Sequence, residues 1–206
     1  MTARVAVLVS GTGRSLENLA RVVRAGELDV ELALVLSDRP GVLALERAAT
    51  LGIEALVVDW KEASDVDAFA SAVFREIESR SIDLIVLAGF LRLLKLPDAW
   101  LGRVLNIHPS LLPAYGGKGF YGNRVHRAVL AAGEEETGAT VHLVDNVYDQ
   151  GPIVLQQRVP VRPEDTVETL AARVFEAECE ALPEGIRRVL RGEVEGVPAG
   201  GGRSTK

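Results

Sequence analysis

Residues 4–23 read RVAVLVSGTGRSLENLARVV and carry the signals of a strand, a tight turn and a helix. The stretch Arg4–Ser10 is apolar from Val5 to Val9, which predicts a strand buried on both faces. Apolar residues then recur at helical spacing within Ser15–Ala25, which predicts an amphipathic helix. A buried strand that enters a helix through glycines is typical of the first half of a βαβ unit, so we expect parallel strands.

The same alternation continues as far as His108. Further strands are predicted at Glu31–Ser37, Ile53–Val58, Asp83–Ala88 and Val104–Ile107. Further helices are predicted at Val42–Leu51 and Asp65–Glu78. Because parallel strands need crossover connections, this alternation predicts a mostly parallel, twisted, Rossmann-like sheet with helices on both faces.

The pattern changes after His108, where a loop rich in glycine and proline begins. We expect a short helix next, Val125–Ala132, followed by an antiparallel strand pair, Ala139–Val144 and Ile153–Val161. A long final helix is expected from Val167 to about Leu190. The acidic run 134–136 is interpreted as a solvated helix end or loop. The whole chain then forms one α/β domain, residues 1–195, followed by a flexible tail, residues 196–206.

Composition excludes several classes of protein. The chain has 206 residues, of which 48% are hydrophobic and 25% charged, so wholesale disorder is excluded. A net charge of −6 disfavours nucleic acid as a partner, and one cysteine excludes an internal disulfide. Three histidines far apart in sequence predict no metal site, and no apolar run is long enough for a membrane span. We expect a cytoplasmic protein without a membrane partner.

The turn Ser10–Ser15 is the first candidate binding site. Its glycines let the backbone approach an anion, and free N–H groups at a helix start favour phosphate. The dinucleotide fingerprint would need glycine at position 16, where the sequence has Leu16. The turn therefore predicts a phosphate that is not part of a dinucleotide, the alternative being a tight turn that binds nothing.

Asn106 and His108 form the second candidate, within LNIHPSLLP at residues 105–113. Alternation along a strand puts both side chains on one face, at the carboxyl end of a central strand where open α/β sheets bind ligands. An amide can stabilise an oxyanion and an imidazole can move protons, as acyl transfer requires. The alternative is a buried structural histidine beside an asparagine that ends a strand.

Asp149 is the third candidate, in the turn Asp149–Pro152. A carboxylate near an imidazole favours its charged form and raises its pKa. The alternative is ordinary turn chemistry, in which aspartate is common. His142, on a predicted strand nearby, is interpreted more simply as a hydrogen-bonded structural residue.

At these motifs the chain resembles a known family. It contains SGxGxxL at 10–16, LAGFLRLL at 87–94, NIHPSLLP at 106–113 and DxGP at 149–152, in that order. Together they are similar to the phosphoribosylglycinamide formyltransferases, which belong to the folate-dependent formyltransferases. The resemblance covers roughly residues 4–192 and implies formyl transfer from 10-formyltetrahydrofolate, a cosubstrate, to the amine of glycinamide ribonucleotide in de novo purine biosynthesis.

The resemblance also implies roles for individual residues. The catalytic residues would be Asn106, His108 and Asp149. The ribonucleotide would be bound by Gly13, Arg14, Ser15 and Glu178. The folate would contact Leu91, Arg92, Leu93, Leu94 and Asn106. It implies direct attack through a tetrahedral intermediate and no metal.

The sequence departs from the common pattern in two places. The loop GGKGFYG at 116–122 is longer, and Lys118 in it would lie near the nucleotide phosphate. An arginine often found before the third helix is absent, and Lys61 is the nearest substitute. Two alternatives stay open: a formyltetrahydrofolate deformylase, which is a hydrolase, or a nucleotide-binding module without catalysis. A monomer and a homodimer fit equally well.

Overall fold

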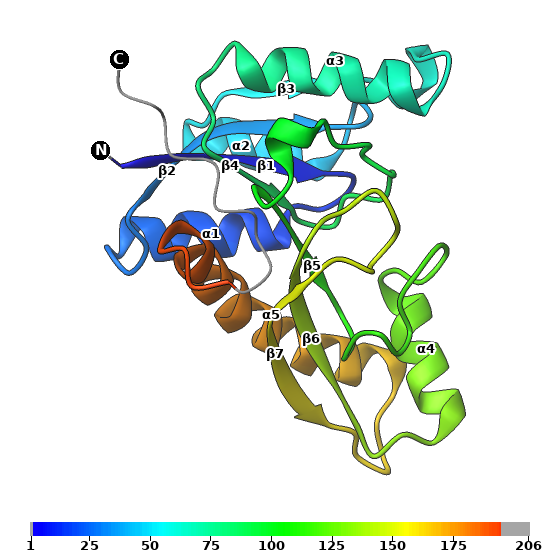
Figure 1. Cartoon of the computed structure of the whole chain (residues 1–206). Helices are drawn as coiled ribbons and strands as arrows, with labels where there is room; N and C mark the ends of the chain where they lie inside the picture. Colours follow the sequence, from blue (N-terminus) through cyan, green and yellow to red (C-terminus); the bar gives the residue numbers. More distant parts are fainter. Residues whose placement is uncertain (1, 195–206) are drawn as a thin grey trace.

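The computed structural model describes residues 2–194 and contains a seven-stranded sheet in the order β3-β2-β1-β4-β5-β6-β7 (Figure 1). The strands are β1 Ala3–Val9, β2 Val30–Ser37, β3 Ala55–Val57, β4 Leu84–Leu87, β5 Val104–His108, β6 Glu136–Leu143 and β7 Ile153–Pro160. The first five are parallel, whereas β6 and β7 are antiparallel to their neighbours. The predicted fold class is confirmed: a mostly parallel α/β sheet that ends in an antiparallel pair.

Helices cover both faces of this sheet (Figure 1). The helices are α1 Arg14–Arg24, α2 Leu43–Leu51, α3 Val66–Glu78, α4 Asn123–Ala132 and α5 Val167–Leu190, with short 3₁₀ turns η1 Trp60–Glu62 and η2 Asp98–Trp100. One hydrophobic core joins α1, α2, α4 and α5 to the sheet. A second core, built around Phe69 and Trp100, packs α3 and η2 on the opposite face.

The central strands are buried on both faces because of this double cover. Every residue from Val5 to Val9 is 0% exposed, as the continuous apolar run predicts. The chain then turns sharply into α1 at Gly13, whose φ is +74°. A Cβ there would lie 2.7 Å from the Ala44 Cβ, so only glycine fits between the first turn and α2.

The structure corrects the start of one strand and confirms the long final helix. Glu136 is the first residue of β6, paired with Pro160, and not part of a loop, because the antiparallel pair extends three residues further than the apolar run 139–144 suggests. Helix α5 continues through Pro183. The predicted tail 196–206 and residue 195 lie outside the described residues. Within residues 2–194, no helix has the length and apolarity to cross a membrane.

Candidate active site

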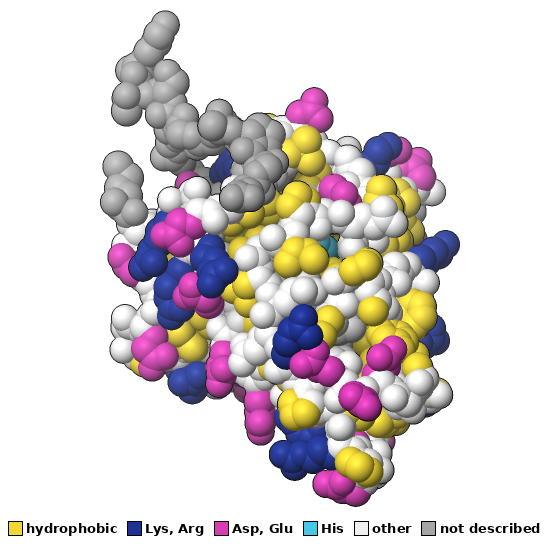
Figure 2. All heavy atoms as spheres, turned by 60° about the horizontal axis from the view of Figure 1, so that its bottom comes forward, with side chains coloured by type: hydrophobic (Ala, Val, Ile, Leu, Met, Phe, Trp, Pro, Cys, Tyr) yellow, Lys and Arg dark blue, Asp and Glu magenta, His cyan; other side chains and the backbone are white. Residues whose placement is uncertain are grey.

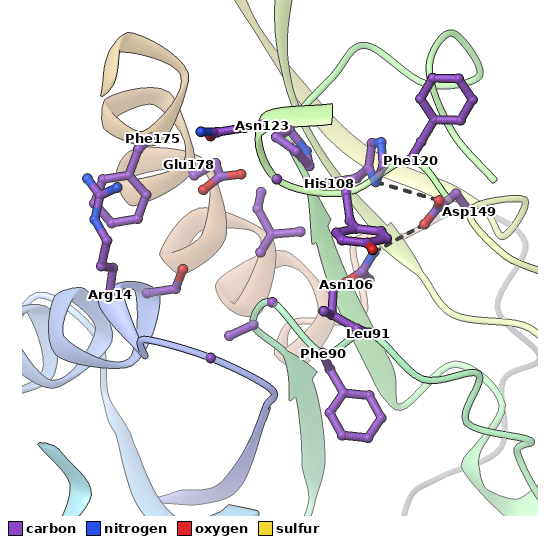
Figure 3. A pocket seen from close by; sticks show the side chains of 18 of the residues that line it. Arg14, Phe90, Leu91, Asn106, His108, Phe120, Asn123, Asp149, Phe175 and Glu178 are labelled. Atoms are coloured by element: carbon purple, nitrogen blue, oxygen red, sulfur yellow. Dashed lines mark hydrogen bonds and ion pairs between the residues drawn. The ribbon is translucent and has the colours of Figure 1, made fainter. Parts of the chain in front are cut away.

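A cleft of about 690 Å³ opens at the carboxyl ends of β1, β4 and β5 (Figure 3). Its walls come from the turn after β1, the loop after β4, residues 117–123, the loop between β6 and β7, and one face of α5. This is the edge at which an open parallel sheet places its ligands. On the face drawn in Figure 2, only a small histidine patch reaches the surface, because each of the three histidines is at most 4% exposed.

The structure brings Asn106, His108 and Asp149 together, and we call these three residues the reacting cluster. Asp149 Oδ2 lies 3.6 Å from His108 Nδ1, and Asp149 Oδ1 lies 3.4 Å from Asn106 Nδ2 (Figure 3). Asn106 and His108 project from β5, whereas Asp149 comes from the loop that follows β6. An amide and an imidazole from one strand thus share one side of the cleft with a carboxylate from a loop that is distant in sequence.

His142 belongs to the same network, which the sequence pattern did not indicate. It lies opposite Asn106 in the antiparallel register of β5 and β6 and is 2% exposed. Its Nδ1 is 2.8 Å from the carbonyl oxygen of Leu143, and since a carbonyl only accepts, Nδ1 carries the proton. Nε2 is then free to accept from Asn106 Nδ2 at 3.0 Å. His142 therefore orients the Asn106 carboxamide.

Burial and charge oppose each other at His108. Burial lowers the pKa of His108, while the Asp149 carboxylate and the Tyr115 carbonyl raise it, and the net direction is downward. Burial raises the pKa of Asp149, but its neighbours, among them the Gly117 N–H that donates to Oδ2 at 2.8 Å, outweigh burial and hold that pKa below its usual range. At neutral pH the resting pair is therefore a neutral imidazole beside a carboxylate. The expected increase in the histidine pKa is wrong because desolvation exceeds the attraction of Asp149.

Gly13, Arg14 and Ser15 line the other end of the cleft, at the N-terminus of α1. The Arg14 guanidinium lies over the Phe175 ring, 3.7 Å from its centroid, and Glu178 faces the same space from α5 (Figure 3). Burial raises the pKa of Glu178 to about 7, although Arg14 opposes this. We call this region the nucleotide end of the cleft, because the sequence predicts that all of its residues except Phe175 bind the ribonucleotide. Its residues are Gly13, Arg14, Ser15, Phe175 and Glu178.

The predicted folate residues divide into two sets. Leu91 and Arg92 line the cleft. Leu93 is half-buried and is not among the lining residues, and Leu94 is 1% exposed within the second core. The side chain of Leu94 therefore packs into the second core and not into the cleft. Of the four residues expected at the folate, Leu91 and Arg92 line the cleft, whereas the side chains of Leu93 and Leu94 do not.

Arg92 is held at the rim of the cleft by a buried carboxylate. Its Nε lies 3.1 Å from Asp38 Oδ2, and its guanidinium lies 5.1 Å from the ring centroid of Trp60. Arg39 pairs with the same carboxylate oxygen at 2.9 Å and also lines the cleft. Asp38 is 1% exposed, so two guanidinium groups share one buried counter-ion.

Two further residues complete the description of the cleft. Lys118 lines it, whereas Lys61 lies on η1 and is not among its lining residues. His126 on α4 also lines it, and its Nδ1 is buried without a hydrogen-bond partner among the described residues. Among residues 2–194, no group of three or more histidine, cysteine or acidic side chains is placed to hold a metal ion.

Comparison with known proteins identifies the family. The model of the family described as formyl transferase matches residues 3–186. The phosphoribosylglycinamide formyltransferase of Haemophilus influenzae is 36% identical over 193 residues, which cover 93% of this chain and 89% of that protein. The trifunctional purine biosynthetic protein adenosine-3 of Gallus gallus is 45% identical over 96% of this chain, but the match spans only 19% of the longer protein.

A solved structure agrees with the sequence relatives. Glycinamide ribonucleotide transformylase 1 of Symbiobacterium toebii superposes with a TM-score of 0.88 at 38% identity, over 95% of this chain and 92% of that one. The matched region includes the strands and loops that form the cleft. The chain therefore belongs to the formyl transferase family.

Proposed function

We propose that this chain transfers a formyl group from 10-formyltetrahydrofolate to the amine of glycinamide ribonucleotide, a step of de novo purine biosynthesis. The observation that carries the proposal is the convergence of Asn106, His108 and Asp149 on one side of the cleft. The N-terminus of α1 at the other end offers backbone N–H groups to a phosphate. The relatives named for this reaction support the same conclusion.

The geometry suggests how the reacting cluster works. The substrate amine attacks the formyl carbon directly, and the developing oxyanion accepts a hydrogen bond from Asn106. One N–H of Asn106 stays on His142 Nε2 at 3.0 Å, while the weaker 3.4 Å contact with Asp149 releases the other N–H for the oxyanion.

His108 moves the proton in this scheme. The Tyr115 carbonyl oxygen lies 2.8 Å from Nε2 and keeps a proton there, so Nδ1 is the nitrogen that gains and loses the second proton. His108 takes the proton that the attacking amine releases, and the charged ring adds its attraction to the oxyanion. It then passes the proton to the departing folate nitrogen, while Asp149 stabilises the charged ring.

The substrates are assigned to the two ends of the cleft. Gly13, Arg14, Ser15 and Glu178 bind the ribonucleotide. Leu91, Arg92 and Asn106 contact the folate. The guanidinium groups of Arg39 and Arg92, which share the Asp38 carboxylate, lie at the rim of the cleft and bind a carboxylate of the folate.

One assay separates this function from the two alternatives. The protein is incubated with 10-formyltetrahydrofolate, with and without glycinamide ribonucleotide, and the folate absorbance is followed. We expect a change that depends on the amine. A change without the amine would indicate a deformylase, and no change in either case would indicate a binding module, so each would refute the proposal.

Three further expectations stay proposals. The formyltransferase domain spans residues 1–195, the chain is a monomer or a homodimer, and it acts in the cytoplasm without nucleic acid or membrane partners. Limited proteolysis, size-exclusion chromatography with light scattering, and cell fractionation test them in turn.

A further inference from the structure

The loop from β5 to α4 begins with a tight hook, residues 110–117, that lies against the reacting cluster. Within the hook, Ser110 Oγ donates to the Ala114 carbonyl at 2.6 Å, and the Ala114 N–H donates to the Leu111 carbonyl at 3.1 Å. Tyr115 has a φ of +56°, in the left-handed region that a tyrosine rarely adopts. Contacts on both sides must therefore hold the backbone in this shape.

The hook contacts both partners of the imidazole–carboxylate pair. The Tyr115 carbonyl accepts from His108 Nε2 at 2.8 Å, and the Gly117 N–H donates to Asp149 Oδ2 at 2.8 Å. A Cβ on the intervening Gly116 would lie 2.5 Å from Leu112 Cδ2 and 3.3 Å from Asp149 Cβ, so a larger residue there would push these side chains aside. Two nearby backbone groups thus fix how His108 and Asp149 face each other.

A side-chain bond anchors the hook to the rest of the fold. Tyr115 Oη donates to Glu134 Oε1 at 2.6 Å, and Glu134 lies between the end of α4 and the start of β6. The Tyr115 ring also meets Phe120, with 6.3 Å between the ring centroids. The hydrogen bond to Glu134 raises the pKa of Tyr115, so the phenol remains a donor at neutral pH.

We propose that Tyr115 and Glu134 are positioning residues for formyl transfer, because their hydroxyl–carboxylate bond holds the hook against His108 and Asp149. The inference rests on the proposed function. The side chains of Tyr115 and Glu134 do not line the cleft. Both act on the reacting cluster through the Tyr115 carbonyl and the Gly117 N–H. When the bond is broken, the hook loosens and His108 spends less time with Nδ1 directed at Asp149.

The inference predicts the direction in which the pH dependence of kcat/KM shifts when the hook loosens. His108 is faced by Asp149 from the loop after β6, by His142 from β6 and by His126 from α4, in addition to the Tyr115 carbonyl. The carbonyl raises the pKa of His108 against the larger effect of burial. Loosening the hook removes this contribution, so the pKa of His108 falls further and the acid limb of kcat/KM moves to lower pH.

Two variants break the bond from its two sides. Tyr115→Phe keeps the ring and removes the hydroxyl, and Glu134→Ala removes the acceptor. The bond is exposed, so we expect each to lower kcat by about fivefold, the worth of one hydrogen bond, with each KM within about twofold of the wild type. Glu134→Gln retains an acceptor oxygen and should restore kcat to near the wild-type value. Glu135→Ala, at the neighbouring exposed acid, is the matched control and should have no effect.

A second readout does not depend on activity. The chain has only three histidines, so their imidazole NMR signals can be assigned by single substitutions and titrated in the free protein. In Tyr115→Phe, the midpoint of His108 should move to lower pH. The inference is overturned if kcat and the His108 titration both match the wild type while only the melting temperature falls, or if Glu134→Gln is as slow as Glu134→Ala. Failure of the proposed function is distinct, because the wild type would then show no amine-dependent turnover.

Discussion

The two ends of the cleft are built differently. At the reacting end, each residue of the reacting cluster already has a partner: Asn106 bonds to His142, His108 to the Tyr115 carbonyl, and Asp149 to the Gly117 N–H. At the nucleotide end, Arg14 lies on an aromatic ring, and no hydrogen bond to Glu178 is found within residues 2–194.

This difference separates two tasks. Stabilising a transition state requires donors that are fixed before the reaction, because reorienting them costs free energy. Binding a nucleotide can leave groups incompletely satisfied until the ligand supplies the missing partners. A carboxyl with a pKa of about 7 is a group of the second kind, since ligand hydroxyl groups would favour its charged form.

The largest effect is expected at the preorganised end. Asn106→Ala removes an oxyanion donor and should lower kcat by about a hundredfold or more, equivalent to roughly 3 kcal/mol. The fold should be retained, because Asn106 is only partly buried. Steady-state kinetics with circular dichroism as the control checks this. Near-wild-type turnover in a folded variant would contradict the assignment.

A smaller effect is expected where α1 begins. Gly13→Ala places a Cβ 2.7 Å from the Ala44 Cβ at a positive φ, and should lower the free energy of unfolding by about 2 kcal/mol. It should also raise the KM for the ribonucleotide. Gly11→Ala is the matched control, because its Cβ meets no atom within 4 Å. Equal losses of stability in the two variants by urea denaturation would show that crowding against α2 is not the cause.

The smallest effect tests the unsatisfied carboxyl. In the folded protein the pKa of Glu178 is raised from 4.5 to about 7, so ionisation costs the folded state stability as the pH rises through this interval. Glu178→Gln should therefore raise the free energy of unfolding at pH 8 by about 1 kcal/mol, less than the full shift implies because the side chain is partly exposed.

The same substitution should weaken ribonucleotide binding. The gain in stability should shrink as the pH falls toward 4.5, which denaturation at a series of pH values measures. A gain that stays constant with pH would show that Glu178 does not titrate in this range.

Much of this fold is predictable from the sequence because the signals are local. The apolar run before Ser10 and the glycines that follow it specify a strand, a turn and a helix with little help from distant residues. The sequence does not mark the start of β6 at Glu136, because an exposed residue can join a strand when its partner is the edge strand β7. The sequence does not show that the Leu94 side chain is buried in the core, because an apolar residue near a pocket can face either the pocket or the core.

The catalytic candidates were predictable as residue types, but their contacts were not. The contact between His142 and Asn106 depends on the register of β5 and β6, which pairs residues 36 positions apart. The hook acts through a backbone carbonyl and a backbone N–H, which every loop possesses, so no residue type marks them. The low pKa of His108 depends on burial in the folded chain, which opposes the effect of its acidic neighbour.

The most direct test of the account asks whether the reacting cluster works as one unit. Asn106→Ala, Asp149→Ala and the double variant are compared by kcat/KM under one set of conditions. When two residues stabilise the same transition state together, removing one already abolishes most of the contribution of the other to kcat/KM. The double variant should therefore be little slower than the slower single variant. Losses that multiply in the double variant would show that the two side chains act independently and would contradict the account.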